Sequence, residues 1–255
     1  MESQARTPRV LIVEDNAQYA VSLVRSFRQS GSLGFFEVDI ATDLSSAWPY
    51  VERDEIDIYV VDLALPKAPE RADSVENGKK LVSRIVERTN AGILVHSDRS
   101  LEREGEEMFA LGADDYLEKG MKPEIVRAQA FALWRRIRMT RQGSSRFFVH
   151  TGRTFRIRDW RFVIGDRVVT SDANEAKRLS PTEHALLAYL CTVEDHQIDR
   201  REFNEAILNR PAHMRDQRID NLIYRIRQKI GECLPLTSKS HGAYKLVDVK
   251  ELRTS

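Results

Sequence analysis

Short apolar runs alternate with longer amphipathic stretches through the first half of the chain. The apolar runs, each of strand length, cover residues 9–13, 35–41, 56–62, 92–97 and 115–119. Between them, apolar positions recur with helical spacing across residues 17–31, 44–54, 78–89, 100–112 and 123–138. Strands that alternate with helices of this length are typical of a parallel sheet. The pattern therefore predicts an α/β domain with a doubly wound, five-stranded parallel sheet.

The second half has a different pattern, in which strand-like runs precede three helices. The runs cover residues 146–150, 154–164 and 166–171. The first helix starts at Ser180, where Pro181 suits the first helical position and Glu183 completes a capping box. The second starts at Asp199, which has Glu202 three residues later. These signals predict helices across residues 179–191 and 199–208.

A third helix is predicted across residues 217–231, and a β-hairpin follows it. The apolar residues of this helix form one stripe, at positions 219, 222, 223, 226 and 230, and the helix ends at Gly231. The hairpin, residues 236–247, turns near His241 and Gly242. Strands, three helices and a terminal hairpin in this order predict an α+β winged-helix domain.

A polar stretch that contains Gly-Ser-Ser, residues 139–146, separates the two patterns. We therefore expect a first domain at residues 1–138, a linker at 139–146 and a second domain at 147–255. The net charge of +1 hides an asymmetry between the halves. From residue 138 onward, 22 Lys and Arg against 15 Asp and Glu give +7, whereas the preceding residues carry 18 against 24, which gives −6. The basic half is the candidate for binding nucleic acid.

The composition is that of a globular protein and gives no sign of a membrane or secreted one. Hydrophobic residues make up 42% of the chain, yet no apolar run approaches the ~20 residues of a membrane helix. The N-terminal residues lack the apolar segment of a signal peptide. The two cysteines, Cys191 and Cys233, lack metal-ligand spacing. We expect a cytoplasmic protein that does not enter membranes.

Charged and polar residues stand where four of the predicted parallel strands end. Glu14 and Asp15 follow the first strand, and Asp62 ends the third. Ser97 and Lys119 end the fourth and fifth. Such sheets bind their ligands at the carboxyl ends of the strands. We therefore expect three carboxylates, a hydroxyl and an ammonium to converge at this edge.

An aspartate at the end of a strand, taken alone, is usually the N-cap of a helix. This is the alternative interpretation of Asp15 and of Asp62. Together, three neighbouring carboxylates repel one another unless a cation compensates. A hard cation such as Mg²⁺ binds a few carboxylates together with water and a phosphoryl oxygen. Ser97 can donate to that oxygen and Lys119 can pair with its charge. The set predicts a Mg²⁺ site that places a phosphoryl group on Asp62.

Residues 8–138 resemble a two-component receiver domain, which has a flavodoxin-like fold. The motifs that carry the resemblance are LIVEDN, VVDLALP, GADDYLEK and the position of Ser97. The resemblance implies that Asp62 is the phosphoacceptor. It implies that Asp15 binds Mg²⁺ directly and Glu14 mainly through water. It also implies that the backbone carbonyl of Ala64 is a metal ligand.

Tyr116 matches the aromatic switch residue of receivers, which swings inward after phosphorylation, and a plain core aromatic is the alternative. Three features depart from the usual receiver pattern. Gly120 stands where a proline normally follows the lysine, which favours a trans peptide bond there. Asp98 replaces a small residue beside Ser97, and residues 67–77 lengthen the loop after the third strand. These departures bear on how efficiently Asp62 is phosphorylated.

The outer side of the third predicted helix carries side chains suited to DNA. Arginine, asparagine and glutamine can hydrogen-bond to base edges in the major groove, and cations can contact phosphates. The alternative is a solvated basic face, which the basic charge of the whole half disfavours. The candidate DNA-binding residues on this helix are Arg218, Asn221, Tyr224, Arg225, Arg227, Gln228 and Lys229.

The second half resembles the effector domain of OmpR/PhoB-type regulators through LSPTEHALLAYL, DRREFNEAIL, RIDNLIYRIRQKIG and GAYKLV, in this order. The resemblance implies that the third helix reads DNA and that the hairpin contacts the minor groove. It also implies that residues 208–217 face RNA polymerase in activators. Ser240 and His241 stand where relatives usually carry Arg and Gly, so the hairpin contacts are assigned to Lys239 and His241.

The whole chain is therefore expected to be a DNA-binding response regulator and not an enzyme. A sensor histidine kinase would phosphorylate Asp62, and the product would bind double-stranded DNA as a homodimer. The usual dimer face of the family is helix four, strand five and helix five of the receiver. Asp115 and Arg136 match charged positions on this face, whereas Ile125 and Gln129 replace usual charges.

Two other interpretations stay open. A pseudo-receiver regulator would act without phosphorylation; Asp98 and Gly120 favour it, and the complete acceptor set opposes it. The second interpretation is a flavodoxin-like or receiver-gated enzyme. A flavin phosphate site would require a Gly, Ser or Thr loop in place of Glu14 and Asp15. The second half contains neither G-x-S-x-G nor HExxH, which disfavours a hydrolase.

Overall fold

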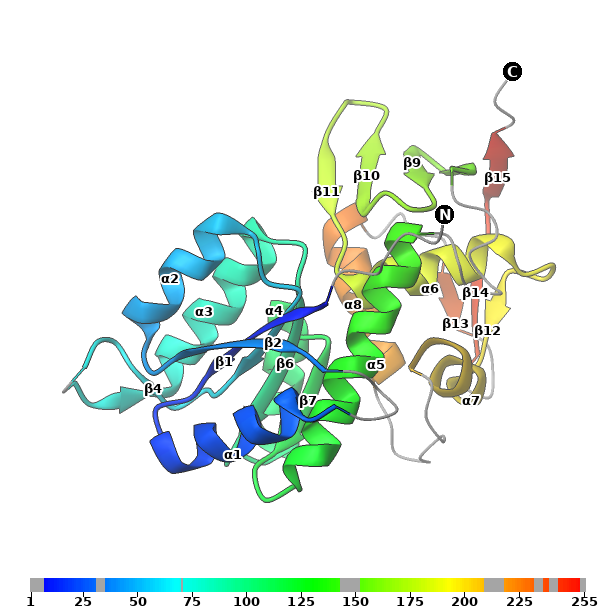
Figure 1. Cartoon of the computed structure of the whole chain (residues 1–255). Helices are drawn as coiled ribbons and strands as arrows, with labels where there is room; N and C mark the ends of the chain where they lie inside the picture. Colours follow the sequence, from blue (N-terminus) through cyan, green and yellow to red (C-terminus); the bar gives the residue numbers. More distant parts are fainter. Residues whose placement is uncertain are drawn as a thin grey trace. The chain divides into compact units, whose positions relative to one another are not determined.

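The computed structural model describes residues 7–30, 35–69, 71–142, 152–208, 218–231, 236–238 and 243–252 (Figure 1). The chain divides into two compact units, residues 1–134 and 135–255, and each is described by itself. Helix α5 (Pro123–Gln142) passes the predicted domain limit at residue 138 without a break. The predicted domain limits and linker therefore stay a prediction. Within the described residues, no helix is both long enough and apolar enough to span a membrane.

The first unit contains a sheet of five parallel strands in the order β2-β1-β3-β6-β7. The chain places β2 on one side of β1 and the later strands on the other, so the order reverses between β1 and β3. Ligands of doubly wound sheets bind at this switch point. The predicted α/β sheet is confirmed, with strands β1 (Arg9–Val13), β2 (Glu37–Ala41), β3 (Ile58–Val61), β6 (Gly92–Ser97) and β7 (Asp115–Glu118).

Polar caps begin two of the helices of this unit. The Asn16 side chain accepts the Tyr19 backbone N–H, and Asp43 forms a capping box with Ser46. A π-helical turn, η1, leads into α4. The helices are α1 (Ala17–Arg28), α2 (Leu44–Arg53), α3 (Val75–Arg88), η1 (Leu101–Gly105), α4 (Glu106–Leu111) and α5. They match the predicted helices, although α3 starts three residues before residue 78.

Helices cover both faces of the parallel sheet (Figure 1). On one face, α2, α3 and α4 pack against alternate residues of the central strands, such as Leu11, Tyr59 and Val95. On the other face, Arg127 of α5 donates to the carbonyls of Ser26 and Gln29 at the end of α1. The central strands are therefore buried on both sides, which leaves their carboxyl ends as the place for polar chemistry.

The long loop after β3 contains a short antiparallel pair, β4 (Leu65–Pro66) and β5 (Asp73–Ser74). The Lys67 carbonyl accepts hydrogen bonds from the backbone N–H and the hydroxyl of Ser45, at 3.1 and 2.7 Å. At the start of α3, a Cβ added to Gly78 would lie 2.5 Å from the Cα of Leu63. The loop is therefore tied to α2, and α3 packs directly on the backbone after Asp62.

The second unit begins with an antiparallel sheet in the order β11-β10-β9-β8-β15. The predicted run 154–164 is two strands, because the chain turns at Arg158, whose φ is 50°. The strands are β8 (Thr154–Ile157), β9 (Trp160–Val163), β10 (Val168–Ser171), β11 (Ala176–Arg178) and β15 (Val249–Leu252). The predicted strand at 146–150 lies outside the described residues, and β11 and β15 were not predicted.

Three helical segments follow this sheet, as predicted. Ser180, Pro181 and Glu183 start α6 (Pro181–Thr192) with the predicted capping box. Asp199 caps α7 (Arg200–Glu202), which continues as the π-helical η2 (Phe203–Leu208). In α8 (Arg218–Ile230), all five predicted stripe positions are buried, at no more than 2% exposure. These helices share one apolar core with the sheet.

A small second sheet, in the order β12-β14-β13, completes the winged-helix fold. Strands β13 (Leu236–Ser238) and β14 (Tyr244–Leu246) pair antiparallel, so the predicted terminal hairpin is confirmed. Its turn, residues 239–242, lies outside the described residues. Strand β12 (Gln197–Ile198) pairs with the other side of β14 and ties the hairpin to the helices.

Candidate functional site

Three carboxylates meet at the carboxyl ends of β1 and β3. Glu14 and Asp15 follow β1, and Asp62 follows β3. One ligand oxygen from each lies within 4.8 Å of the others. Glu14 and Asp62 are buried, at 2% and 4% exposure, and Asp15 is half-buried. The pairing of these two strands continues past their ends, because the Asp62 N–H donates to the Val13 carbonyl at 2.9 Å.

Lys119, which follows β7, places its ammonium between two of these carboxylates. Its Nζ donates to Asp62 Oδ2 at 2.8 Å and to the Glu14 carboxylate at 2.9 Å. The Lys119 backbone N–H donates to the Ser97 carbonyl at 2.7 Å, so β6 fixes where the side chain starts. The predicted convergence of strand ends therefore brings Glu14, Asp62 and Lys119 into direct contact.

Burial dominates the electrostatics of this cluster. It raises the pKa of Glu14 to about 7, although the hydrogen bond from Lys119 acts against it. Burial also raises the pKa of Asp62, again opposed by Lys119. Burial alone would lower the pKa of Lys119, but its hydrogen bonds to Asp62 and Glu14 outweigh that effect and the pKa is raised. The site therefore favours a further positive charge beside the carboxylates.

Ser97 and Tyr116 lie on neighbouring strands beside the carboxylates. Ser97 is buried, and its Oγ accepts the Arg99 backbone N–H at 3.3 Å. The Tyr116 side chain points into the interior, and its hydroxyl donates to the Arg99 carbonyl at 2.7 Å. Burial raises the pKa of Tyr116 to about 12. Both residues contact the chain at Arg99, so they meet where β6 leads into η1.

In the second unit, the outer face of α8 differs in part from the prediction. Tyr224 and Gln228 are exposed, and Arg227 and Lys229 are half-buried. Arg225 is 5% exposed, so its predicted place on the outer face is wrong. The side chains of Arg218 and Asn221 lie outside the described part of the chain, as do Lys239 and His241 of the hairpin.

A buried carboxylate on α6 explains why Arg225 turns inward. Glu183 is fully enclosed, and its Oε1 lies 3.4 Å from Arg225 Nε. Its Oε2 accepts hydrogen bonds from Lys229 Nζ at 2.6 Å and from the Ser180 backbone N–H at 2.7 Å. Burial opposes ionisation, yet these two cations lower the pKa of Glu183. The cluster joins the start of α6 to the C-terminal half of α8.

The other end of α8 is also fixed. Asp220, in its first turn, accepts two hydrogen bonds from Arg200 of α7, at 2.9 and 2.6 Å, and one from the Tyr244 hydroxyl of β14. A helix held at both ends, with an exposed polar side, can present that side as a rigid surface.

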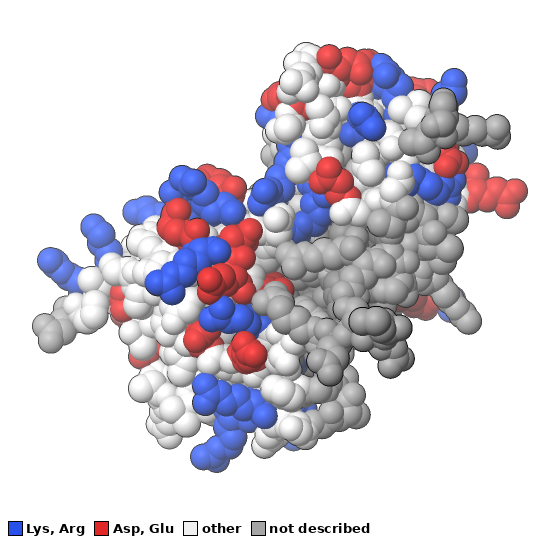
Figure 2. Space-filling model, turned by 45° about the horizontal axis from the view of Figure 1, so that its top comes forward, with Lys and Arg blue, Asp and Glu red and all other residues white. Residues whose placement is uncertain are grey.

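Lys and Arg are interspersed with Asp and Glu on the face shown in Figure 2, with no large patch of one sign among its described residues.

Comparison with known protein families agrees with both halves of this description. The family model for the response regulator receiver domain matches residues 10–130. The model for the transcriptional regulatory protein C-terminal domain matches residues 174–242. The chain belongs to the two-component response regulators of the OmpR/PhoB type. It is a DNA-binding regulator of transcription, a class whose members are generally not enzymes.

One relative and one solved structure match nearly the full length of the regulator, and another relative matches about half of it. It is 25% identical over 243 residues to the TorCAD operon transcriptional regulatory protein TorR of Escherichia coli, covering 94% of this chain and 98% of TorR. It is 36% identical over 131 residues to the transcriptional regulatory protein PhoP of Escherichia coli, covering 50% of this chain and 52% of PhoP. A solved RitR mutant has a TM-score of 0.70 at 17% identity, covering 94% of this chain and 98% of RitR, a likeness of fold.

The acidic cluster of the regulator can hold a metal ion. Carboxylate oxygens are the ligands that hard divalent cations prefer. Glu14, Asp15 and Asp62 offer three within 4.8 Å, and the cation in direct contact with two of them is Lys119. The cluster has three carboxylates and one ammonium in contact with them, so its charge can be balanced further by a bound cation. The donor set therefore fits a hard divalent ion.

Two of the departures from the usual receiver pattern adjoin site residues, because Gly120 follows Lys119 and Asp98 follows Ser97. The Lys119–Gly120 peptide bond is trans, as the sequence favours, and Gly120 has a φ of 100°, which suits glycine. Asp98 is exposed beside Ser97. The N–H of Leu101, the first residue of η1, is bound by Glu118 Oε1 at 2.7 Å. A carboxylate other than Asp98 therefore accepts the first backbone N–H of this helical segment.

Tyr19 and His96, which no sequence motif indicates, lie against the cluster. Lys119 Nζ lies 5.3 Å from the centroid of the Tyr19 ring. The Tyr19 hydroxyl oxygen lies 3.1 Å from His96 Nε2. A histidine directly before Ser97, in an otherwise apolar strand, was the available signal. Its partner on α1 carries no motif, so only the fold reveals the pair.

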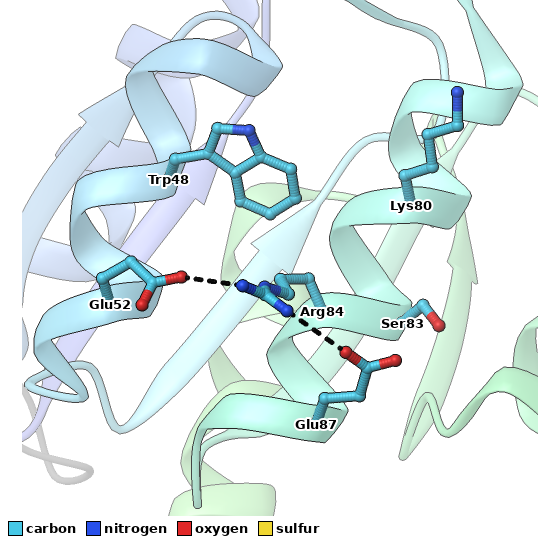
Figure 3. Close-up of a pocket in the computed structure, with 6 residues that line it drawn as sticks. All are labelled: Trp48, Glu52, Lys80, Ser83, Arg84 and Glu87. Carbon is cyan, nitrogen blue, oxygen red and sulfur yellow. Dashed lines mark hydrogen bonds and ion pairs between the residues drawn. The ribbon is translucent and has the colours of Figure 1, made fainter.

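A separate hollow of about 610 Å³ opens between α2 and α3 (Figure 3). Arg84 crosses it and pairs with Glu52 at 3.3 Å and Glu87 at 3.5 Å. Trp48 forms the wall on α2, and Lys80 and Ser83 line the α3 side. None of these residues belongs to the acidic cluster, so the hollow takes no part in its chemistry.

Proposed function

We propose that the regulator accepts a phosphoryl group on Asp62 from a sensor histidine kinase and thereby controls its binding to DNA. One observation carries the proposal: carboxylates from two adjacent strand ends lie within 4.8 Å of one another around the ammonium of Lys119. An oxygen of Asp62 bonds to phosphorus as the bond between phosphorus and the kinase histidine breaks. Such transfer depends mainly on position and on neutralising charge.

Each residue of the cluster has a role in this transfer. Mg²⁺, held by Glu14, Asp15, Asp62 and the Ala64 carbonyl, would supply positive charge to the phosphoryl oxygens. Lys119 leaves its pairing with Asp62 and pairs with the transferred group. The Ser97 hydroxyl, buried at the end of β6, donates to a phosphoryl oxygen. Tyr116 would report the change, because its hydroxyl already contacts the backbone beside Ser97.

The second unit carries the output. In the proposal, α8 enters the major groove of double-stranded DNA through Arg218, Asn221, Tyr224, Arg227, Gln228 and Lys229, and the hairpin contacts DNA through Lys239 and His241. Arg225 is left out because it is buried against Glu183. If the regulator is an activator, residues 208–217 face RNA polymerase in this proposal. The setting for these contacts is the cytoplasm.

The proposed homodimer uses the face formed by α4, β7 and α5. Two charged residues matched to this face, Asp115 and Arg136, are 3% and 8% exposed in the chain by itself. Ile125, where relatives usually carry a charge, is 45% exposed. The contact therefore depends more on apolar side chains than on ion pairs.

The test is phosphorylation of the purified full chain by acetyl phosphate with Mg²⁺. We expect a mass gain of one phosphoryl group, mapped to the peptide that contains Asp62. Asp62→Asn should abolish the gain, and phosphorylation of the parent should change its DNA affinity. Transfer to another residue, or no transfer to the folded parent, would contradict the proposal.

A second candidate is a pseudo-receiver that regulates transcription without phosphorylation. Asp98 places an exposed carboxylate next to Ser97, which favours this candidate. The same experiment separates the two functions. A parent that takes no phosphate, yet binds DNA as well as Asp62→Asn does, would support the pseudo-receiver.

A further inference from the structure

Lys119 has a third neighbour besides its two carboxylates. The ring of Tyr19, in the first turn of α1, has its centroid 5.3 Å from Lys119 Nζ. The Tyr19 and His96 rings have centroids 5.4 Å apart and planes inclined by 31°. The Tyr19 hydroxyl oxygen lies 3.1 Å from His96 Nε2, a hydrogen-bond distance. Tyr19 thus connects the acceptor site to the interior of the sheet.

His96 is a fixed anchor for this ring. It is 1% exposed and lies in β6, which is paired on both sides in the sheet. Burial lowers its pKa to about 4, and the charge of Lys119 acts in the same direction. The imidazole is therefore neutral near pH 7 and adds no positive charge beside the ammonium. A neutral, enclosed ring can hold the tyrosine in place without repelling Lys119.

We propose that Tyr19, anchored on His96, is a positioning residue that directs Lys119 toward Asp62 during phosphoryl transfer. The inference rests on the proposed phosphorylation of Asp62. A ring face attracts an ammonium without using up a directed hydrogen bond. Lys119 therefore keeps its donors for Asp62 and then for the arriving phosphoryl oxygen. The ring stays beside the ammonium through this exchange and limits its swing into solvent.

Two variants of Tyr19 separate the ring from the hydroxyl. Tyr19→Phe keeps the ring and loses the bond to His96, whereas Tyr19→Leu keeps an apolar side chain and loses the ring. With acetyl phosphate and Mg²⁺, we expect Tyr19→Leu to slow phosphorylation of the full chain about threefold to tenfold. Tyr19→Phe should retain most of the parent rate. The Mg²⁺ concentration for half-maximal rate should change by less than about twofold in both variants.

A second measurement needs neither Mg²⁺ nor a phosphodonor. Protons next to the Lys119 ammonium should show a ring-current shift in the NMR spectrum of the parent. Comparison with Lys119→Arg assigns the signal. The shift should persist in Tyr19→Phe and disappear in Tyr19→Leu. Melting temperatures of the three proteins show whether each variant is folded.

The outcomes distinguish this inference from the proposed function. Equal rates for the parent and a folded Tyr19→Leu would overturn the positioning role while leaving phosphorylation of Asp62 in place. Equal slowing in both variants would overturn it too, because the ring would not be the cause. A parent that takes no phosphate fails the proposed function itself and removes the role in transfer. The ring-current shift then still tests whether Tyr19 holds Lys119 in place.

Discussion

Asp98 places an exposed carboxylate next to Ser97 in the receiver. Burial raises the pKa of the Tyr19 hydroxyl and the charge of Asp98 adds to this effect, so the field of Asp98 reaches the side of the site where Lys119 lies. An arriving phosphoryl group would be repelled by the same charge. We predict that Asp98→Ala speeds phosphorylation of Asp62 by about twofold to fivefold, a modest effect because water screens exposed charges.

The measurement is the rate with acetyl phosphate, together with the melting temperature of the same variant. Asp98→Asn is the matched control, since it removes the charge and keeps the size and the hydrogen-bonding shape. Both variants should be faster than the parent. A lower melting temperature with an unchanged rate would show that Asp98 stabilises the fold and does not gate the site.

His184 of α6 makes the stability of the second unit, residues 135–255 and called the effector unit from here on, depend on pH. Burial lowers its pKa to about 3, against 6.5 for an ordinary histidine. Between these values the unfolded chain binds a proton that the folded chain excludes. The stability linked to His184 is therefore full above pH 6.5 and is lost as the pH falls. The loss amounts to at most about 1.4 kcal/mol of unfolding free energy for each pH unit below 6.5.

His184→Phe removes the titrating group and keeps an aromatic ring against Phe162, whose ring centroid lies 5.2 Å away. We predict that the free energy of unfolding of this variant falls less than that of the parent between about pH 7.5 and pH 5.5. Chemical denaturation at both pH values measures the two changes. Parallel losses in parent and variant would show that other groups control the acid sensitivity.

At the scale of elements, α8 is the helix whose surface the structure redefines. Arg225 and Lys229 pair with the buried Glu183, so removing Arg225 leaves a buried charge short of a partner. We predict that Arg225→Ala lowers the free energy of unfolding of the effector unit by about 3 kcal/mol. The salt dependence of DNA binding should stay unchanged, because the residue does not face solvent.

Arg227→Ala is the matched control on the same helix. Arg227 is half-buried and remains among the proposed DNA contacts. If it contacts a phosphate, its loss should reduce the salt slope of binding by about one. Affinity measured across a range of salt, with denaturation of both variants, separates the two residues. A stable Arg225→Ala with a reduced slope would return Arg225 to the DNA-binding face.

The spacing of apolar residues was enough to predict most of these helices and strands. It failed for Arg225, whose burial depends on a charge that is distant in the sequence. The apolar stripe of α8 was predicted residue for residue, because burial of Leu222 and Ile226 needs only helical spacing. Arg225 sits next to that stripe, where spacing cannot say on which side of the boundary an arginine falls. The answer comes from Glu183, which the fold brings to α8 from the first turn of α6.

The acceptor site shows the same division. Glu14, Asp62 and Lys119 could be predicted to meet because parallel strands end at one edge of the sheet. The contact of Tyr19 with His96 depends on how α1 packs over β6, for which the sequence carries no periodic signal. The short strands β11 and β15 were missed because charged residues interrupt their apolar character, as in Ala-Lys-Arg of β11 and Val-Lys-Glu-Leu of β15.

At the scale of the whole molecule, the two units have separate apolar cores. A metal ion bound at the acidic cluster should therefore stabilise the first core and leave the second almost unaffected. We predict that Mg²⁺ at about ten times its dissociation constant raises the free energy of unfolding of the receiver by about 1.4 kcal/mol. Hydrogen exchange of β1 and β3, compared with α6, measures the two units in the intact chain.

Asp15→Asn tests the origin of this effect. Asp15 is the half-buried carboxylate of the cluster, so the Asp15→Asn variant should fold normally. It should bind Mg²⁺ more weakly than the parent, because an amide replaces a carboxylate ligand. Protection in β1 and β3 should then respond less to Mg²⁺ than in the parent. An equal response in Asp15→Asn would place the stabilising ion elsewhere.

The crowding of carboxylates around one ammonium also determines what laboratory evolution would do to this protein. Selection for heat resistance in the absence of divalent ions rewards any change that relieves a buried negative charge. Uncharged replacements of Glu14 and Asp62, whose burial already raises their pKa values, would be among the variants enriched. The enriched variants would be more thermostable but would have lost the response to a signal. A thermostability screen of this regulator must therefore retain a selection for phosphorylation.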